Sequence, residues 1–255
     1  MNFAKNLFLL AFVLPLLYLT ACNGSAAFDY SQAPGTLLRM PDTMFRNKTV
    51  AVVPFLDNRG ALNSDETRAD DAHVNTSGDH GSLCLALIPL LPAGYIEKGE
   101  PDRSSDFITI SQFKFNPPQD LADAAFVSLN AAGMFKQVYR LNNKTAPQTD
   151  YIWRGKILNT NYKGYLYSYC ITCIASPALW ILGAPSATSF NELWVQFDLV
   201  ETATGKTVWT YNFRGNDYIV HWIYARYNTD CSMYAKLMKT AMNRAIYELG
   251  EKFPK

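Results

Sequence analysis

Residues 192–213, ELWVQFDLVETATGKTVWTYNF, decide the fold class of this chain. Apolar and polar side chains alternate along the first half, and the apolar positions are Leu193, Val195, Phe197 and Leu199. A turn at Thr204 and Gly205 leads into a second alternating run, which places on one face Thr207, Trp209, Tyr211 and Phe213. Successive side chains of a strand point to opposite faces, so the pattern predicts two antiparallel strands joined in a hairpin.

Further strands are expected on the amino-terminal side of this hairpin. Residues 49–53 (TVAVV) are apolar and mostly β-branched, which is typical of a buried strand. A shorter strand is expected at 137–141, and residues 151–169 alternate loosely, with tyrosines on one face. These segments predict a mixed or antiparallel sheet of about five strands.

Two main helices should cover one face of this sheet and make an α+β domain. The first should begin after Asn116, where two prolines suit a first helical turn, and end at Gly133. The second should begin near Asp230 or Ser232. Its apolar stripe consists of Tyr234, Leu237, Met238, Ala241, Met242, Ala245, Leu249 and Phe253.

The first residues have the pattern of a secretory signal peptide. Lys5 gives a positive start, and the apolar run 7–19 is shorter than the roughly 20 residues of a spanning helix. The run ends in Leu-Thr-Ala-Cys at 19–22, which resembles the lipobox of bacterial lipoproteins. This resemblance implies cleavage between Ala21 and Cys22 and acylation of Cys22, which anchors the protein to a membrane.

We therefore expect a cleaved signal helix at 1–21, a flexible lipidated tether at 22–48 and a single α+β domain at 49–255. In enterobacterial lipoproteins an Asp after the lipidated Cys tends to retain the protein at the inner membrane. Here that position is Asn23, so the expected location is the periplasmic face of the outer membrane.

Short phrases of the domain resemble lipoproteins with a TolB amino-terminal-like domain. The phrases are VAVVPF at 50–55, DYIWRG at 150–155 and TGKTVW at 204–209. The curli-secretion lipoprotein CsgG and the penicillin-binding-protein activator LpoB carry related domains. Two apolar phrases, at 85–89 and 179–183, are similar to uncharacterised envelope lipoproteins. The resemblance implies a fold and a location, and it transfers no catalytic residue.

Two segments without charged residues fall between the expected elements: 83–96 (LCLALIPLLPAGYI) and 170–190 (CITCIASPALWILGAPSATSF). Both contain prolines, which disfavour a spanning helix. Since ordinary loops are polar, these loops either close a core, form a contact surface or insert into the membrane beside the anchor. The residues expected at a contact surface are Leu87, Ile88, Leu90, Leu179, Trp180 and Ile181.

The cysteines other than Cys22 allow several arrangements in an oxidising compartment. They are Cys84, Cys170, Cys173 and Cys231. A disulfide from Cys84 to Cys170 or Cys173 would join the two apolar loops. Residues 170–173 also match the C-x-x-C of thiol oxidoreductases and half of a zinc site, but no thioredoxin-like unit is visible around them. Buried thiols or a structural bridge are the favoured interpretation.

Composition and motifs argue against several other classes. The chain has 23 basic and 22 acidic residues, so it has no overall field that would attract nucleic acid. The acidic segment 57–80 has no calcium-loop or zinc-helix spacing, so we expect a solvated loop and no metal. His221 lies in an aromatic stretch and is expected to be a satisfied, partly buried side chain rather than a general base. No nucleotide or nucleophile motif occurs, so we expect no catalytic residue, cofactor or small-molecule substrate.

The favoured hypothesis is a non-enzymatic, lipid-anchored outer-membrane protein that serves as a scaffold or accessory subunit of an envelope complex. It would contact the membrane through its lipid, and it would self-associate or bind an envelope protein. One alternative is a ring-forming component of a secretion or transport channel, like CsgG. A second is a periplasmic thiol-redox protein that uses Cys170 and Cys173.

Overall fold

The computed structural model describes residues 25–30, 43–59, 94–99, 112–141, 148–167, 169, 176–225 and 230–254. The strands are β1 (Ser25–Ala27), β2 (Thr49–Val52), β3 (Leu56–Asp57), β4 (Gly94–Gly99), β5 (Gln112–Lys114), β6 (Gln137–Arg140), β7 (Tyr151–Asn159), β8 (Tyr162–Tyr167), β9 (Ala187–Glu201) and β10 (Thr207–His221). The helices are α2 (Pro117–Ala132), α3 (Ser176–Ile181) and α4 (Asp230–Lys252).

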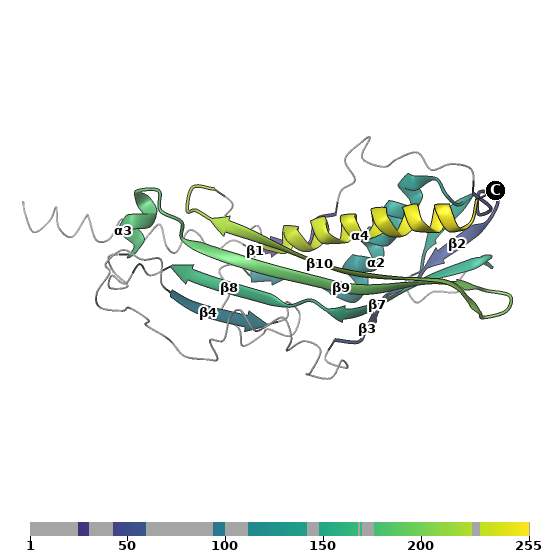
Figure 1. The fold of residues 1–255 in the computed structure, drawn as a ribbon, viewed down its shortest axis with the longest axis horizontal. Helices are drawn as coiled ribbons and strands as arrows, with labels where there is room; N and C mark the ends of the chain where they lie inside the picture. Colours follow the sequence, from purple (N-terminus) through teal and green to yellow (C-terminus); the bar gives the residue numbers. More distant parts are fainter. Residues whose placement is uncertain are drawn as a thin grey trace, which may run out of the picture.

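The predicted hairpin spans the length of the sheet (Figure 1). Its strands β9 and β10 contain 15 residues each and pair antiparallel along their whole length. At about 3.3 Å per residue, such a strand extends roughly 50 Å. Its inward-facing apolar positions are buried: Leu193, Val195, Phe197, Leu199, Trp209 and Phe213. The hairpin and the facing of its strands are therefore confirmed, except at Thr207, which is exposed because the register shifts by one residue between Thr207 and Trp209.

The other edge of β9 joins two groups of shorter strands. Its carboxyl-terminal half pairs antiparallel with β7, which continues into the parallel strands β2 and β6. Its amino-terminal half pairs with β8, which continues into β4. With β3 beside β7, these strands form a mixed eight-stranded sheet, while β1 and β5 form a separate pair. The α+β class with a mixed sheet is confirmed.

The sheet has more strands than the sequence pattern predicts. The alternating segment 151–169 breaks at Thr160 and Asn161, which separates β7 from β8. Residues 94–96 and 187–190, expected in the apolar loops, belong to β4 and β9. The buried face at the start of β9 carries small and polar side chains, Ala187, Ser189 and Asn191. Hydrophobicity therefore does not alternate there, and the pattern conceals the strand.

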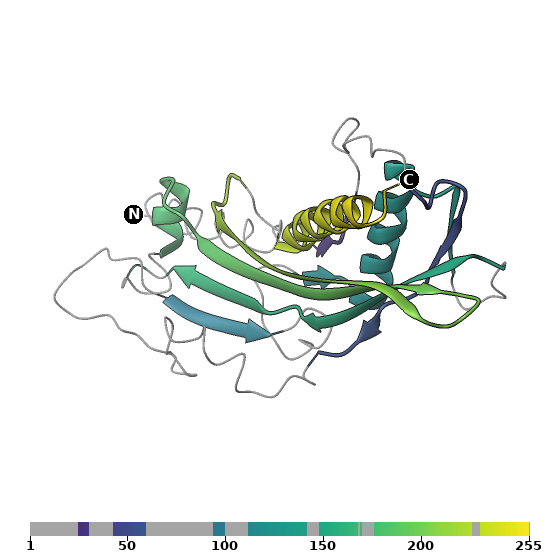
Figure 2. The same ribbon diagram turned by 45° about the vertical axis from the view of Figure 1, so that its right-hand side comes forward.

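Helices α2 and α4 pack together on one face of the sheet, as predicted (Figures 1 and 2). The predicted stripe of α4 is buried from Tyr234 to Leu249. At the start of α2 the Asn116 side chain makes no capping bond; instead the Asn116 N–H donates to the Asp120 carboxylate at 2.7 Å. Gly133 ends α2 in the left-handed conformation, with φ 63°.

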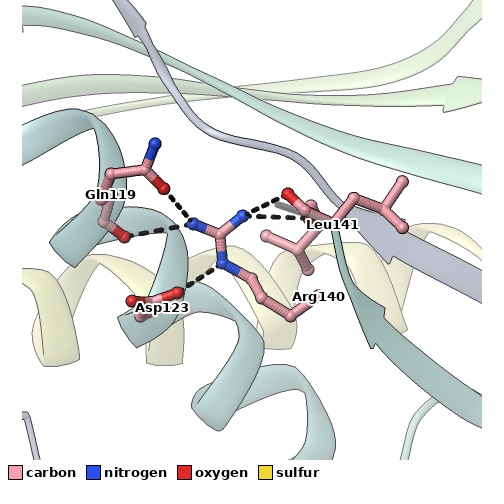
Figure 3. Close-up of polar contacts among 5 residues, drawn as sticks. Gln119, Asp123, Arg140 and Leu141 are labelled. Atoms are coloured by element: carbon pink, nitrogen blue, oxygen red, sulfur yellow. Dashed lines mark hydrogen bonds and ion pairs between the residues drawn. The ribbon is translucent and has the colours of Figure 1, made fainter. Parts of the chain in front are cut away.

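Arg140, the last residue of β6, ties α2 to the parallel strands (Figure 3). Its Nη2 donates to the Gln119 side-chain oxygen at 2.9 Å, and its Nη1 donates to the Leu141 carbonyl at 3.0 Å. Its Nε donates to the Asp123 carboxylate on α2. Because a guanidinium presents its donors in a rigid fork, one side chain bonds a helix and a strand end together. The crossover from β2 through α2 to β6 is fixed in this way.

Part of the expected tether packs against the domain. Strand β1 pairs in parallel with β5, and the Phe28 and Phe115 rings stack at 5.1 Å. Phe45 is buried in the core, and the Met44 N–H donates to the Phe253 carbonyl at 3.4 Å. Large aromatic side chains in the described residues 25–30 and 43–48 of the expected tether are therefore stabilised by burial against the domain.

Gly155 of β7 is required by the packing of Phe55. A methyl group at position 155 would lie 2.4 Å from carbon atoms of the Phe55 ring. Phe55 is itself buried, and its N–H donates to the Pro118 carbonyl at 2.9 Å. The ring therefore lies directly over the glycine and links the sheet to the start of α2.

Gly155→Ala should destabilise the domain by about 2–3 kcal/mol, because the added methyl group displaces a packed ring. Urea unfolding followed by circular dichroism measures this loss. The loss should shrink in a Phe55→Leu background. Gly133→Ala is the control: it should cost about 1 kcal/mol from its left-handed φ alone, and equally in both backgrounds. An unchanged Gly155→Ala cost in the Phe55→Leu background would contradict the packing argument.

Asp150 fixes the start of β2 against the start of β7. One of its carboxylate oxygens accepts bonds from the Thr49 N–H at 2.8 Å and the Thr49 hydroxyl at 2.9 Å. The other pairs with the Lys48 ammonium at 3.2 Å. The Thr49 bonds, and then Lys48, hold the pKa of Asp150 below its usual value of 3.8. The charged carboxylate therefore stabilises the folded domain.

The Asp150→Asn variant should be less stable than the native domain at pH 7, and the difference should diminish as the pH falls below 3.8. A carboxyl group whose pKa is lowered by folding stabilises the fold above its unfolded pKa and loses that effect upon protonation. Urea unfolding at a series of pH values measures the difference. A difference that is constant from pH 7 to pH 2 would show that the carboxylate charge contributes nothing.

Candidate interaction surface at the distal end of the sheet

The distal tip is formed by α3, the turn 182–186 and the turn 222–225 that follows β10. Figures 1 and 2 place α3 beyond the ends of β8 and β9, opposite the end that carries the carboxyl terminus. The turn at 222–225 is closed by two backbone bonds between Trp222 and Ala225, at 3.0 and 3.1 Å. The two segments that flank the hairpin thus meet at one end of the molecule.

A Schellman motif ends α3 and fixes the most exposed part of the tip. The Ala184 N–H donates to the Leu179 carbonyl, and the Gly183 N–H donates to the Trp180 carbonyl, both at 3.0 Å. Gly183 adopts φ 97°, a conformation that side-chain-bearing residues rarely adopt. The residue before it, Leu182, is therefore held in one position, and 82% of its surface is exposed.

Aromatic side chains tie this helix end to the sheet. The Tyr224 hydroxyl donates to the Ile181 carbonyl at 2.7 Å, and the Trp180 indole N–H donates to the Tyr167 carbonyl at 3.2 Å. The Tyr169 hydroxyl donates to the Pro185 carbonyl at 2.7 Å. Burial raises the pKa of Tyr169 above its usual value of 10.0, so its hydroxyl keeps the proton that it donates. These three bonds connect α3 and the turn after it to β8, to Tyr169 and to the turn that follows β10.

The surface of the tip is apolar and carries no charged side chain. Ile181 is 50% exposed and Tyr224 is 68% exposed, in addition to Leu182. No Asp, Glu, Lys or Arg occurs in residues 164–191 or in 218–225. An exposed apolar protrusion of this kind is a candidate site of contact with a partner or a membrane.

A buried polar cluster lies at the base of the tip. The Ser189 hydroxyl lies 2.8 Å from His221 Nε2 and 3.2 Å from the Tyr162 hydroxyl. All three residues are fully buried. The Tyr162 hydroxyl lies over Gly164, where a methyl group would approach it to 2.8 Å. A serine and a histidine in contact resemble a nucleophile and its base, but full burial denies them a substrate. The cluster holds β8, β9 and β10 together.

Only some of the predicted site residues can be placed. Leu179, Trp180 and Ile181 lie on α3, and Ile181 is the most exposed of the three. Cys231 is the second residue of α4. Outside the described residues lie Ala21, Cys22, Cys84, Leu87, Ile88, Leu90, Cys170 and Cys173. The disulfide and thiol hypotheses therefore stay predictions. His221 is buried and hydrogen-bonded, as expected, and its burial is complete rather than partial.

The sequence interpretation missed the most exposed residue of the tip, Leu182, and its aromatic neighbour Tyr224. A signal for Leu182 is present, because a glycine after an apolar helical segment marks a helix end and leaves the preceding residue at the cap. Tyr224 belongs to the aromatic stretch around His221, but nothing in that stretch indicates its contact with α3. That contact depends on the meeting of β9 and β10 at the tip.

The described residues offer no cluster of metal ligands. None of their His, Cys, Asp and Glu side chains gather in a group of three that could hold a metal ion. From the acidic segment 57–80 only 57–59 are described, and there the Arg59 guanidinium group donates two bonds to the Asp57 carboxylate, at 2.8 and 2.7 Å. None of the helices in the described ranges is long and apolar enough to cross a bilayer.

The architecture is that of an α+β domain with a mixed sheet covered by helices on one face. Solved structures of similar outline include a DUF330 protein from Xanthomonas campestris, which is 11% identical, with a TM-score of 0.42 and coverage of 89% of this chain and 92% of its own. A PelC dodecamer from Paraburkholderia phytofirmans is 13% identical, with a TM-score of 0.34 and coverage of 81% and 93%. These scores are too low to support a conclusion about this chain. No family model matches the chain. No curated protein matches it in sequence.

Ser189→Ala should destabilise the domain by about 1–3 kcal/mol, because it removes the hydroxyl that faces His221 Nε2 in a buried site. Urea unfolding at pH 7 measures the effect. Asn216→Ala, at an exposed position of β10, is the control and should change stability by less than about 0.5 kcal/mol. A Ser189→Ala variant as stable as the native domain would contradict the structural role of the cluster.

Proposed function

We propose that this protein is a non-enzymatic, lipid-anchored component of the outer membrane that faces the periplasm and serves as a scaffold or accessory subunit of an envelope complex. The observation that carries the proposal is the apolar tip, in which Leu182 is exposed and fixed by a Schellman motif. A loop that serves only to connect strands does not need a fixed leucine in solvent. The tip supports a role in contact with another component of the envelope, either a protein or the lipid surface.

The buried cluster beneath the tip supports the non-enzymatic part of the proposal. The Ser189 hydroxyl and His221 Nε2 lie 2.8 Å apart, and both residues are fully buried. Their hydrogen bonds connect strands instead of facing an open site. What this end of the domain offers to other molecules is therefore apolar surface.

Lipidation of Cys22 would confine the domain to one surface and raise the effective concentration of its partners there. The connection between Cys22 and the folded domain would be short, because residues 25–30 pack against the domain. With so few residues between Cys22 and β1, the anchor would hold the domain close to the membrane.

A second candidate is self-assembly through the edge of β10. In the described part of the sheet, β10 pairs with β9 and with no other strand. An unpaired strand edge is a ready template for pairing with another chain, and natural edges are usually short or interrupted by Pro. β10 has 15 residues and no Pro. A second copy of this chain is the partner that such an edge would pair with in a ring or dimer.

Cells that express the protein should incorporate radioactive palmitate into it, and Cys22→Ser should abolish the labelling, because acylation requires the cysteine thiol and the amino terminus created by cleavage. Immunoprecipitation and autoradiography measure the label. Cys231→Ser is the control and should remain labelled. Labelling that persists in Cys22→Ser would refute the anchor.

The scaffold part of the proposal is tested on the lipidated protein after extraction in mild detergent. Light scattering should give a protein mass above one chain, or cross-linking in cells should join the protein to a defined envelope partner. A single-chain mass together with no cross-linked partner contradicts the proposal.

A further inference from the structure

We propose that the distal tip inserts into the surface of a lipid bilayer, with Ile181 and Leu182 among the acyl chains and the aromatic side chains at the level of the headgroups. The inference names the contact of the tip and rests on the proposed function only for the lipid anchor. It concerns a shallow insertion that orients the domain, and no part of it requires a spanning segment.

The backbone N–H groups at the end of α3 meet a main requirement of a lipid environment. Polar backbone groups in hydrocarbon must be satisfied within the protein, since no water is available there. The N–H groups of Leu182, Gly183 and Ala184 all donate to carbonyl groups of α3, at 3.0 Å. The carbonyl of Ile181 accepts from the Tyr224 hydroxyl at 2.7 Å. The exposed apolar residues are thus attached to backbone that carries its own hydrogen bonds.

The distribution of side chains also fits a membrane interface. Tyr and Trp are enriched where hydrocarbon meets water, because their rings are apolar and their polar atoms bond at the interface. Trp180 and Tyr224 flank the two aliphatic residues, and Tyr167 and Tyr169 follow toward the sheet. No charged residue, which would resist entry, occurs from 164 to 191 or from 218 to 225.

The shape of the tip favours lipid over a folded protein partner. Leu182, directly after α3, has 82% of its surface exposed, and α3 lies beyond the ends of β8 and β9 (Figure 1). A protein interface of standard size combines an apolar centre with about ten hydrogen bonds and a polar rim. The tip offers a small convex apolar surface whose nearby polar groups already bond within the chain. A fluid bilayer can accommodate such a protrusion without presenting a pocket of matching shape.

The strength of insertion explains why an anchor would accompany it. Burial of two aliphatic side chains raises partition into a bilayer on the order of a hundredfold, which is marginal for an otherwise soluble domain. Durable attachment requires two signals that act together. Acyl chains at Cys22 would supply the attachment, and the tip would fix which end of the domain faces the bilayer.

The direct test uses the lipidated protein in vesicles of phosphatidylethanolamine and phosphatidylglycerol that contain a diazirine-bearing phospholipid. After irradiation, mass spectrometry should find lipid adducts on the peptide that contains Ile181 and Leu182. Leu182→Asp should lower this yield about tenfold, in line with the cost of placing a charge in lipid. Leu56→Asp is the matched control, because Leu56 is 57% exposed on β3, outside the tip, and should leave the yield unchanged.

A second measurement separates the tip from the anchor. The mature chain with Cys22→Ser has no lipid, and its flotation with the same vesicles at millimolar lipid reports on the tip alone. Leu182→Asp should lower the bound fraction about tenfold, whereas Leu56→Asp should not. Circular dichroism should show the same fold in both variants, since each substituted side chain is exposed.

The inference is overturned if the tip peptide carries no lipid adduct in the lipidated protein while cross-links join the tip to a second chain. It is also overturned if Leu182→Asp and Leu56→Asp float equally well. Neither outcome bears on palmitate labelling at Cys22, so failure of the inference is distinguishable from failure of the proposed function.

Discussion

The structure depends on the hydrogen bonds that satisfy the polar groups at Thr160 and Asn161, where the sheet is interrupted. These residues separate β7 from β8, and both strands must still pair with the continuous strand β9. The Tyr234 hydroxyl of α4 donates to the Thr160 carbonyl at 2.9 Å and lies 3.1 Å from the Asn161 carbonyl, while Arg59 donates to the Thr160 hydroxyl at 2.7 Å. Left without partners in the interior, such groups would cost about 1–3 kcal/mol each. The helix layer and the sheet therefore hold each other in register at the point where two half-sheets become one.

The lengths of the elements explain why the two ends of the domain differ in chemistry. Helix α4, with 23 residues, is about 35 Å long at 1.5 Å per residue, and the hairpin extends roughly 50 Å. Helix α4 is therefore too short to cover the hairpin along its whole length. Where its cover stops, the inward face of the sheet changes from Leu193 and Val195 to Ser189 and His221, which bond to each other. The distal end is thus held by hydrogen bonds and aromatic contacts, and this leaves its aliphatic residues available to the outside.

The sequence predicted those parts of the fold whose packing repeats with a regular period. The alternation in β9 and β10 and the stripe of α4 follow from one buried face, and the ends of α2 follow from Pro117 and Gly133. The remaining elements depend on contacts between distant residues. In the sequence Phe45 looks like part of a linker. In the structure it packs against Phe135 and Tyr151, with 5.3 Å between ring centres in each pair. The start of β9 was hidden because its buried positions are polar. Of the candidate site, α3 was predicted as a contact segment, whereas the exposed position of Leu182 follows from the left-handed Gly183.

The contact between Met44 and Phe253, with the bridge from Thr43 to Pro254, has a consequence for the order of assembly. It joins the first residues of the folded core to its last, and β2 lies between strands that come much later in the chain. Folding slows when contacts join residues far apart in sequence, since each long loop must close before its contact is gained. During synthesis the amino-terminal residues emerge first. The contact between Met44 and Phe253 therefore cannot form until the last helix, α4, has been made. Until then, the apolar face of the hairpin that α4 covers is exposed, which would make the incomplete chain a client for chaperones that bind unfolded proteins.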